Sequence, residues 1–542
     1  MKRLKWGAVA LTLALAVSAC GGNTGGTGGA APTPDGPVPV AQDVVVKSDS
    51  AQALQRGEVK PGGTLRVGML AAPESLDPGG VVSLQASLMH LIYDSLFVYD
   101  ELGNVTPELA ESIETTDGGT TWIMKLPTGV KFHDGTDFNS AAVVAHLNRV
   151  GREGSLSRSA TDVRQIASME TPDDTTVRFV LKSSNMTFPK IFVTAVVLAA
   201  GMVPSPTAVE KYGDQFGLHP VGVGPFKVKQ FSAGGDVVLE RNENYRVPGQ
   251  PLLDGLTFVV AADTQSRLQA AIAGDLDIGS TQNGRDLAAA TDAGLTSLYQ
   301  PDGTFFNIIL NMEKPPFNDP NFRKAVAHGI DNQALVDAVF DGKATPMSGY
   351  FPTSNPYYNA EAGYPAYDLE AAKRLVEEYK AKGGNPEFTF VSNPPPEYQR
   401  IAQLVQQMLQ EAGMTVHIRI IDQPTTITEA LSGNYQAQLR FTEVRAEVDM
   451  NMRTLYYGTS RGNVGRGNDP RMDQILDELT TPEGQERKEE LYAEMQTVMA
   501  NWVPHIPLVA HRNGWYVGKN VAAFPGNRPG IGNPDWRLVA HS

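Results

Sequence analysis

Cysteine is almost absent from this sequence, in which Cys20 is the only one among 542 residues. One thiol has no partner within the chain, so no internal disulfide bond holds the fold, which must rest on packing. The nine histidines are scattered, and no two of them have the spacing of a metal site. Only His133 has a carboxylate beside it, at Asp134, and we interpret this pair as part of a surface loop. We therefore expect no metal and no cofactor.

Motifs that mark nucleotide binding are also missing. The glycine-rich segment near the N-terminus has neither the strand before it nor the helix after it that a phosphate-binding loop requires. We therefore exclude ATP binding by this chain and expect a protein that is not an enzyme. The 60 acidic residues make some close carboxylate pairs inevitable by chance, so an extracellular hydrolase with a glycosidase-like pair stays open as a distant alternative.

Long apolar runs are absent after residues 6–17, which are uncharged and mostly apolar. This run is shorter than the about 20 residues that a membrane-spanning helix needs. Three of the five residues before it are basic, and small residues follow it. The pattern is typical of a secretory signal peptide, which we expect at residues 1–19.

The residues that follow the signal peptide predict a lipid anchor. Val17-Ser18-Ala19-Cys20 resembles the bacterial lipobox, in which cleavage before the cysteine leaves a thiol that carries diacylglycerol. The resemblance implies that Cys20 is lipidated and attaches the protein to a membrane surface. Residues 20–60 begin with glycine, threonine, alanine and proline and stay polar, so we expect them to form a flexible tether.

Basic residues are fewer than acidic ones, because the chain has 45 lysines and arginines and 60 aspartates and glutamates, which give a formal net charge of −15. Nucleic acids and anionic lipids repel an acidic protein, so we exclude nucleic acid as a partner. The chain beyond the tether has about 480 residues, which predicts two or three domains.

Short strands and amphipathic helices alternate in this part without a fixed repeat. Alternating apolar residues predict the strands, and helical spacing after caps such as Asn139 and Asp368 predicts the helices. The pattern is that of a mixed α/β protein. Strands are expected at residues 64–69, 121–126, 176–181, 226–228 and 237–239, and helices at 139–150, 264–273, 319–330, 368–381, 397–412 and 483–503.

A series of short segments carries a family signature. The segments include Ile92-Tyr93-Asp94-Ser95-Leu96-Phe97, Pro107-Glu108-Leu109-Ala110-Glu111-Ser112, Val130-Lys131-Phe132-His133-Asp134-Gly135, Val223-Gly224-Pro225-Phe226 and Phe322-Arg323-Lys324-Ala325-Val326. In their order and spacing over roughly residues 61–520, the chain resembles the family 5 extracellular solute-binding proteins, the peptide- and nickel-type binding proteins of ABC importers. Trp122, Phe132 and Asn139 within the signature have the character of scaffold residues.

The resemblance implies an α/β, bilobal, periplasmic-binding-protein-like fold of type II, with three domains and an insertion in the large lobe. The ligand would be enclosed between lobes that close by a hinge. Chain crossings near residues 305 and 510 would form this hinge. Domain I is expected to hold residues 61–92, 222–305 and 511–542, the inserted domain II residues 93–221, and domain III residues 306–510.

The same resemblance implies the function. It describes an extracytoplasmic lipoprotein that captures a small solute between its lobes and delivers it to the permease subunits of an ABC importer. ATPase subunits would be reached only indirectly. We expect a monomer, anchored by lipid in the periplasm or on the outer face of the cytoplasmic membrane. A peptide or peptide-like ligand is expected first, and a sugar, an organic anion or a metal chelate is the alternative.

One departure from the family pattern concerns the ligand. Peptide-binding members carry a Trp followed three residues later by an Asp that pairs with the α-ammonium of the ligand. Alignment without gaps on Thr454-Leu455-Tyr456 places Phe441 and Val444 at these positions. A buried ammonium without a counter-charge is costly. The usual contact is therefore missing, unless the adjacent Glu443 replaces it.

Aromatic and polar residues near the expected crossings are further candidates for ligand contact, because aromatic side chains supply a large contact area in a cleft. Guanidinium groups in the third domain suit a carboxylate or a phosphate. Core packing and surface ion pairs are the alternative roles of these residues. The predicted ligand-binding residues are Phe305, Phe306, Asn307, Tyr350, Phe351, Asn393, Arg440, Phe441, Glu443, Arg445 and Asp449, and no catalytic or metal-binding residue is predicted.

Overall fold

A computed structural model of the chain describes residues 44–47, 52–80, 86–100, 102–155, 157, 159–193, 200–299, 304–353, 355–443, 448–480, 484–527 and 534–542. Cys20 and the expected signal peptide lie outside these ranges, as do Val444 and Arg445. Within the ranges, no helix combines the length and the apolar character that crossing a membrane requires.

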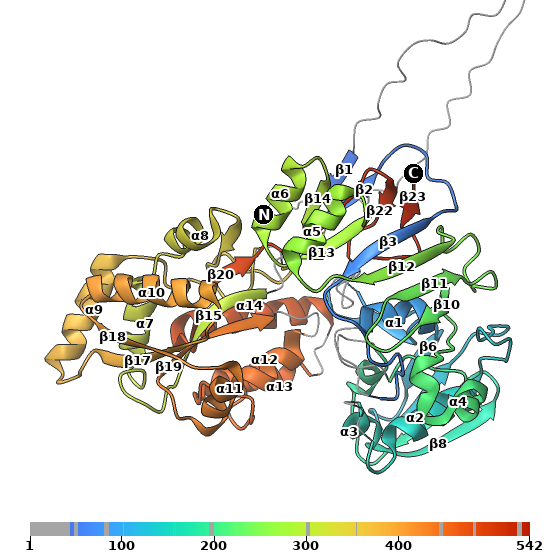
Figure 1. Cartoon of the computed structure of the whole chain (residues 1–542). Helices are drawn as coiled ribbons and strands as arrows, with labels where there is room; N and C mark the ends of the chain where they lie inside the picture. The colour runs from blue at the N-terminus through green and yellow to red at the C-terminus, as the bar shows by residue number, and fades with distance from the viewer. Residues whose placement is uncertain are drawn as a thin grey trace, which may run out of the picture. The chain divides into compact units, whose positions relative to one another are not determined.

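A seven-stranded sheet is assembled from the beginning, the middle and the end of the chain, which lie side by side in Figure 1. β12, β3 and β13 form a parallel centre, and antiparallel strands extend it on both sides. Val67, Leu256 and Ile278 of these central strands lie in its core. The order is β10 (Phe226–Phe231), β11 (Val237–Arg241), β12 (Gly255–Val260), β3 (Thr64–Met69), β13 (Ile278–Thr281), β21 (Gly514–Val517) and β14 (Thr296–Tyr299), with helices α1 (Ala86–Tyr93), α5 (Thr264–Ala273) and α6 (Gly284–Asp292) packed against these strands.

A small four-stranded sheet brings part of the expected tether into the folded protein. Leu54 is 2% exposed in the core of the seven-stranded sheet, and Arg56 donates hydrogen bonds to two carbonyl oxygens near the C-terminus, at 2.6 and 2.9 Å. The prediction of a flexible tether through residue 60 is therefore wrong for this part, because the C-terminal segment supplies a strand partner. The sheet order is β1 (Val44–Lys47), β2 (Gln52–Gln55), β22 (Val521–Phe524) and β23 (Ala540–His541).

A separate four-stranded antiparallel sheet holds the signature segments of the first half. Trp122 and Phe132 are buried in its core, and the Asn139 side chain accepts a hydrogen bond from the N–H of Ala142. The scaffold role of these three residues is thereby confirmed. The sheet order is β6 (Ser112–Thr115), β7 (Thr121–Lys125), β9 (Thr176–Leu181) and β8 (Ile166–Asp173), with a hairpin of β4 (Phe97–Tyr99) and β5 (Val105–Pro107), helices α2 (Ser140–Gly151), α3 (Ala160–Val163) and α4 (Pro206–Tyr212), and 3₁₀ helices at Phe188–Phe192 and Gly213–Leu218.

The third large sheet has six strands and carries helices on both faces. Phe306 packs in a core with α7 to α10, whereas its neighbour Phe305 packs in a second core with α12 to α14. Adjacent side chains of a strand point to opposite faces, so these cores lie on opposite sides of the sheet. The order is β16 (Ala344–Pro346), β20 (His505–His511), β15 (Thr304–Leu310), β19 (Ala437–Glu443), β17 (Glu387–Ser392) and β18 (Thr415–Ile420), and the helices are α7 (Pro320–His328), α8 (Asn332–Phe340), α9 (Leu369–Ala381), α10 (Pro396–Glu411), α11 (Gln423–Ser432), α12 (Val448–Tyr456), α13 (Pro470–Glu478) and α14 (Gln485–Trp502).

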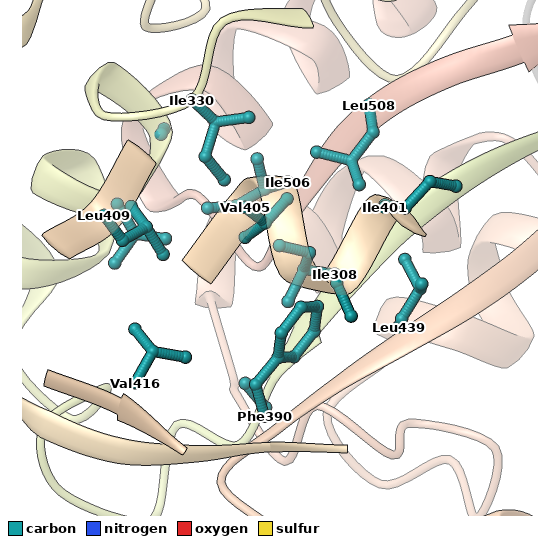
Figure 2. Close-up of a cluster of buried hydrophobic side chains, with 14 of the residues drawn as sticks. Ile308, Ile330, Phe390, Ile401, Val405, Leu409, Val416, Leu439, Ile506 and Leu508 are labelled. Atoms are coloured by element: carbon teal, nitrogen blue, oxygen red, sulfur yellow. The ribbon is translucent and has the colours of Figure 1, made fainter. Parts of the chain in front are cut away.

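The core between α10 and this sheet fixes the position of the helix. Figure 2 shows Ile401, Val405 and Leu409 of α10 above Phe390 and Leu439 of the strands, and all five side chains are fully buried. Only three residues separate the end of β17 from the start of α10. The first turn of α10 is therefore held at the carboxyl end of β17.

The chain crosses between the seven-stranded and the six-stranded sheet twice. It crosses between β14 and β15, where Thr304 begins the new strand, and again between β20 and β21. Asn513 of the second crossing donates a hydrogen bond to Thr304 Oγ1 at 3.2 Å, so the two crossings are in contact. Their positions agree with the expected hinge near residues 305 and 510, while the domain boundaries and the hinge motion stay predictions.

The local predictions from sequence are confirmed for most elements. The six predicted helices correspond to α2, α5, α7, α9, α10 and α14, and their ends differ from the prediction by at most two residues. Strands β3 and β9 match their predicted ranges in full. The mixed α/β class is confirmed as well.

Candidate ligand-binding site

One strand of the six-stranded sheet has an open edge. β19 pairs with β15 along its whole length, but with β17 only at Ala437 and Gln438. Residues 440–443 therefore extend beyond the carboxyl end of β17, and among the described residues no strand pairs with them on that side. In open α/β sheets, ligands bind outside the carboxyl ends of parallel strands. An unpaired strand edge also presents free backbone donors and acceptors.

Arg440 lies on this open part of β19, opposite Asn307 of β15. The guanidinium is partly buried, and its Nη1 has no hydrogen-bond partner and no contact with solvent. Burial lowers the pKa of Arg440, and the nearby Tyr435 and Tyr398 act in the opposite direction. No carboxylate among the described side chains lies within ion-pairing distance of Arg440. The prediction of Arg440 as an anion-binding group is thus consistent with its surroundings.

Asn307 and Thr442 form a polar pair next to Arg440. Asn307 Nδ2 donates to Thr442 Oγ1 at 2.6 Å, and Asn307 Oδ1 is buried without a hydrogen-bond partner. An unsatisfied buried carbonyl oxygen is costly. Asn307 therefore has one free acceptor near the open edge, whereas Thr442 was not among the predicted site residues.

Tyr398 stands in the first turn of α10, beside the same edge. Its ring packs edge-on against Phe306, with 4.9 Å between the centroids, and Phe306 packs against Phe441 at 5.3 Å. Burial raises the pKa of the Tyr398 phenol, Glu397 raises it further, and Arg440 lowers it. Both of these charges therefore lie close enough to act on one phenol group.

Glu397, the residue before Tyr398, also lies in the first turn of α10 and was not among the predicted site residues. It is partly buried, and burial raises the pKa of its carboxyl group while Arg285 lowers it. Its carboxylate makes no hydrogen bond or ion pair among the described residues. In the sequence it marks only the start of a helix after three prolines, and a helix start is a common place for an acidic residue.

The aromatic residues predicted to contact the ligand are core residues in this structure. Phe305, Phe306, Tyr350 and Phe351 are each at most 3% exposed. Phe305 packs against Tyr350 with 5.4 Å between the ring centroids, on the opposite face of β15 from Phe306. Phe441 is only partly buried and lies on the face of Phe306. Core packing therefore accounts for the buried four, and their contact with a ligand stays a prediction.

Two of the other predicted site residues, Asn393 and Glu443, stand at the ends of strands β17 and β19. Asn393 follows β17, and its Nδ2 donates to Ile421 O and Thr426 Oγ1 at 3.1 and 3.0 Å, so this amide already ties two strand ends together. Glu443 is the last residue of β19, and Asp449 lies in α12. Arg445 falls outside the described residues. The roles of these four residues stay predictions.

A cavity of about 530 Å³ lies elsewhere, at the signature turn. It is lined by Gly129, Lys131, Phe132, His133, Gly135, Lys227, Asn242, Asn244 and Tyr245. We expected the His133 ring at the surface of this loop. The ring is half-buried instead, and its Nε2 lies 3.0 Å from the carbonyl oxygen of Gly224. Burial lowers the pKa of His133 to about 4, so the ring is neutral at pH 7 and holds two chain segments together.

The structure gives no support to a hydrolase. The sequence Gly458-Thr459-Ser460-Arg461-Gly462 matches the Gly-x-Ser-x-Gly pattern of a nucleophile elbow, which requires a turn from a strand into a helix. Here the segment follows helix α12, and Ser460 Oγ donates to the carbonyl oxygen of Thr454 at 2.7 Å. Among the described residues, no three His, Cys, Asp or Glu side chains are grouped as metal ligands.

The seven-stranded and six-stranded sheets are joined by two chain crossings, an arrangement typical of proteins that bind a solute between two lobes. Comparison with known proteins gives the family. The model of the bacterial extracellular solute-binding proteins, family 5 (middle), matches residues 104–463, and this chain belongs to that family. Its members are solute-binding proteins of ABC transporters and not enzymes, and they act outside the cytoplasm.

Individual relatives agree with this assignment. The glutathione-binding protein GsiB of Escherichia coli K12 is 28% identical over 458 residues, which cover 82% of this chain and 88% of GsiB. The structure of HbpA2 from Haemophilus parasuis superposes with a TM-score of 0.79 at 21% identity, over 89% of this chain and all of HbpA2. The substrate-binding protein CtaP of Listeria monocytogenes gives a TM-score of 0.76 at 21% identity, with 89% and 100% coverage. These structures share the periplasmic-binding-protein fold predicted for this chain.

Proposed function

We propose that this solute-binding protein captures a short peptide or a peptide-like solute with a free carboxylate group and delivers it to the permease subunits of an ABC importer. The observation that carries the proposal is the unpaired guanidinium of Arg440 at the open edge of β19. A guanidinium that is partly removed from water and has no counter-charge is unfavourable. A ligand carboxylate relieves this cost with two parallel hydrogen bonds.

The open strand edge supports a peptide in particular. In residues 440–443, the backbone N–H and C=O groups that do not face β15 are available to pair with an extended ligand backbone, which is a common way in which proteins bind peptides. GsiB, the relative at 28% identity, is named for binding glutathione, which is itself a tripeptide with carboxylate groups. An organic anion or a metal chelate shares the carboxylate but does not use the strand edge.

Delivery depends on the two crossings between the sheets. A ligand that contacts both lobes binds the closed form more tightly than the open form, so binding shifts the protein toward closure. The permease then distinguishes loaded from empty protein by shape, and the ATPase subunits respond without touching this chain. We expect a monomer, because one chain contains both lobes.

Arg440→Gln tests the ligand-binding part of the proposal. Protein purified without unfolding retains bound solute, and native mass spectrometry identifies it. For a peptide so identified, Arg440→Gln and amidation of the ligand carboxylate should each cost about 2 kcal/mol or more in calorimetric binding free energy. Arg453→Gln is a matched control, because Arg453 lies in α12 and not on the open edge, and it forms an ion pair with Asp477 at a distance of 2.8 Å. A neutral sugar as the bound solute would refute the proposal.

Cys20→Ala tests the lipid anchor. Wild-type protein expressed in its host should fractionate with membranes and carry the mass of a diacylglyceryl group on Cys20, since stable attachment needs more than one acyl chain. The variant should be released in soluble form with its ligand affinity unchanged. An anchor elsewhere would leave the variant in the membrane fraction.

A further inference from the structure

A groove of about 430 Å³ lies between helices α2 and α3 and strand β8, which are neighbours in the fold (Figure 1). All of its lining residues fall between positions 144 and 182. None of them belongs to the six-stranded sheet or to the two crossings. The groove is therefore separate from the open edge of β19, and the proposed capture of a solute gives it no role.

The floor of the groove is apolar. Leu147 and Val163 are at most 4% exposed, and Val144, Ile166 and Met169 are partly buried against the same core. Apolar side chains that stay partly exposed in a concave surface are typical of an interaction site, because an apolar partner removes them from water. The floor therefore favours an occupant with apolar groups of its own.

The rim of the groove is basic. Arg152, Arg164 and Lys182 line it, and none of the described lining residues is acidic, although acidic residues outnumber basic ones in the whole chain. Arg164 is held at the C-terminal end of α2, because its Nε and Nη2 donate to the carbonyl oxygens of Gly151 and Arg152 at 3.0 and 2.8 Å. Its Nη1 has no partner among the described residues, so it is available to an anionic group.

Neighbouring carboxylates do not neutralise this rim. Glu153 and Asp162 are close in sequence but do not line the groove, and Glu170 of β8 pairs with Arg178 at 3.0 Å. Within the described part of the chain, none of the three rim cations forms an ion pair. Charge complementarity therefore favours an acidic occupant.

Strand β8 adds a free backbone edge to the groove. It is the last strand of its sheet, and among the described residues it pairs only with β9. Ser168 and Met169 are adjacent in this ladder and point to opposite faces of the strand, yet both line the groove. The groove therefore follows the edge of β8, where backbone N–H and C=O groups can pair with an extended polypeptide.

We propose that this groove docks an extended, acidic segment of a permease subunit. Its apolar side chains cover the floor, its carboxylates pair with Arg152, Arg164 and Lys182, and its backbone pairs with β8. The identity of the partner rests on the proposed function, whereas the chemistry of the segment rests on the groove alone. An anionic lipid headgroup would also suit the three cations, but it makes no use of a strand edge.

A labelled hexapeptide of three Val-Glu repeats, acetylated and amidated at its ends, tests the groove by fluorescence anisotropy with the full-length mature protein. Its Val-Gln counterpart should bind about tenfold or more weakly, because it lacks the carboxylates. Methylation of every second peptide nitrogen should abolish binding, since it removes donors that pair with a strand edge. The variant with Arg152→Gln, Arg164→Gln and Lys182→Gln should lose the preference for Val-Glu. Two controls should behave as the wild type, namely Arg440→Gln and the variant with Lys229→Gln, Lys373→Gln and Lys380→Gln, whose lysines pair with surface carboxylates elsewhere.

The outcomes separate the groove from the proposed function. Equal binding of the two peptides, binding that survives methylation, or loss of binding in Arg440→Gln would overturn the proposal. Binding only to vesicles of anionic phospholipid, weakened in the triple rim variant, would assign the groove to a membrane surface instead.

Uptake by host cells tests the permease as the partner. The triple rim variant should reduce uptake of the solute retained by the wild type about tenfold, while its calorimetric affinity for that solute stays within about twofold of wild type. Unchanged uptake would refute docking of the permease at this groove. Absence of uptake with the wild type would refute the proposed function, and with it the permease as the partner.

Discussion

Replacing Lys488 by Met should weaken ligand binding although Lys488 lies far from the open edge of β19 along the chain. The turn between β4 and β5 touches the helical layer of the six-stranded sheet at this lysine. Lys488 Nζ donates to Leu102 O at 2.8 Å and to Asn104 Oδ1 at 3.1 Å. The Tyr357 hydroxyl donates to the same Leu102 oxygen, and Leu102 packs against the core of α12 to α14. These contacts link the sheets independently of the two crossings.

The size of the effect follows from these hydrogen bonds. A hydrogen bond to a charged group contributes about 1.5–3 kcal/mol and a neutral one about 1 kcal/mol, and partial exposure reduces both. If the lobes open at the predicted hinge, this contact breaks, so we expect it to stabilise only the closed form. Lys488→Met should therefore lower the apparent ligand affinity by about 5- to 30-fold, which corresponds to about 1–2 kcal/mol. Tyr357→Phe should cost less, and the double variant less than the sum, because both groups share one acceptor.

Calorimetry gives the affinities, and small-angle X-ray scattering gives the decrease in radius of gyration on ligand binding. Lys380→Met is the matched control, since Lys380 pairs with Glu377 on the surface of α9 at 2.8 Å. It should leave both quantities unchanged. Wild-type affinity and an unchanged scattering difference in Lys488→Met would refute the reasoning, because the contact would then not belong to the closed form.

Further predictions concern stability. Burial, with Glu108 nearby, raises the pKa of Asp94 to about 6, so the contribution of Asp94 to stability is complete below about pH 4 and is lost as the pH rises through 6. Relative to Asp94→Asn, the unfolding free energy of the wild type in urea should therefore fall by about 3 kcal/mol from pH 4 to pH 7.5. A difference that stays constant with pH would contradict this. Leu54→Ala should lower the unfolding free energy by about 2–4 kcal/mol, whereas Gln55→Ala should leave it almost unchanged. Equal effects of the two substitutions would show that β2 belongs to the flexible tether. Phe306→Leu should lower the unfolding free energy by about 1–3 kcal/mol with ligand affinity within about twofold of wild type, and a larger affinity loss would assign Phe306 to the site.

Local signals explain which parts of the fold could be predicted. Helix α5 is capped by Asp263, whose side chain accepts from the N–H of Ser266, and it ends at Gly274 with a φ of +83°. Both boundaries are encoded by residues within one turn of the helix. β2 has no such signal, because Leu54 is one apolar side chain in a polar stretch and its partner Phe524 lies near the other end of the chain. Pairing over such a distance leaves no periodic pattern in either segment.

The same distinction between local and long-range signals applies to the candidate site. Arg440 could be proposed from its chemistry alone, because a guanidinium suits a carboxylate wherever it lies. Its lack of a partner depends on β17 ending at Ser392 while β19 continues, and no local pattern reports this difference. Glu397 has the sequence context of an ordinary helix start. The aromatic pair Phe305 and Phe306 is the opposite case, since composition favoured ligand contact whereas the structure buries the two rings on opposite faces of β15, where core packing accounts for them.

Family membership therefore transfers the scaffold more reliably than the ligand. The scaffold depends on many buried side chains, and each tolerates replacement by a residue of similar size. The predicted choice of ligand rests instead on few residues, such as Arg440 on the open part of β19, where one substitution changes the charge that a ligand meets. At 28% identity to GsiB, the fold of the whole chain is therefore transferred, and the identity of the solute is left to the binding experiments with Arg440→Gln.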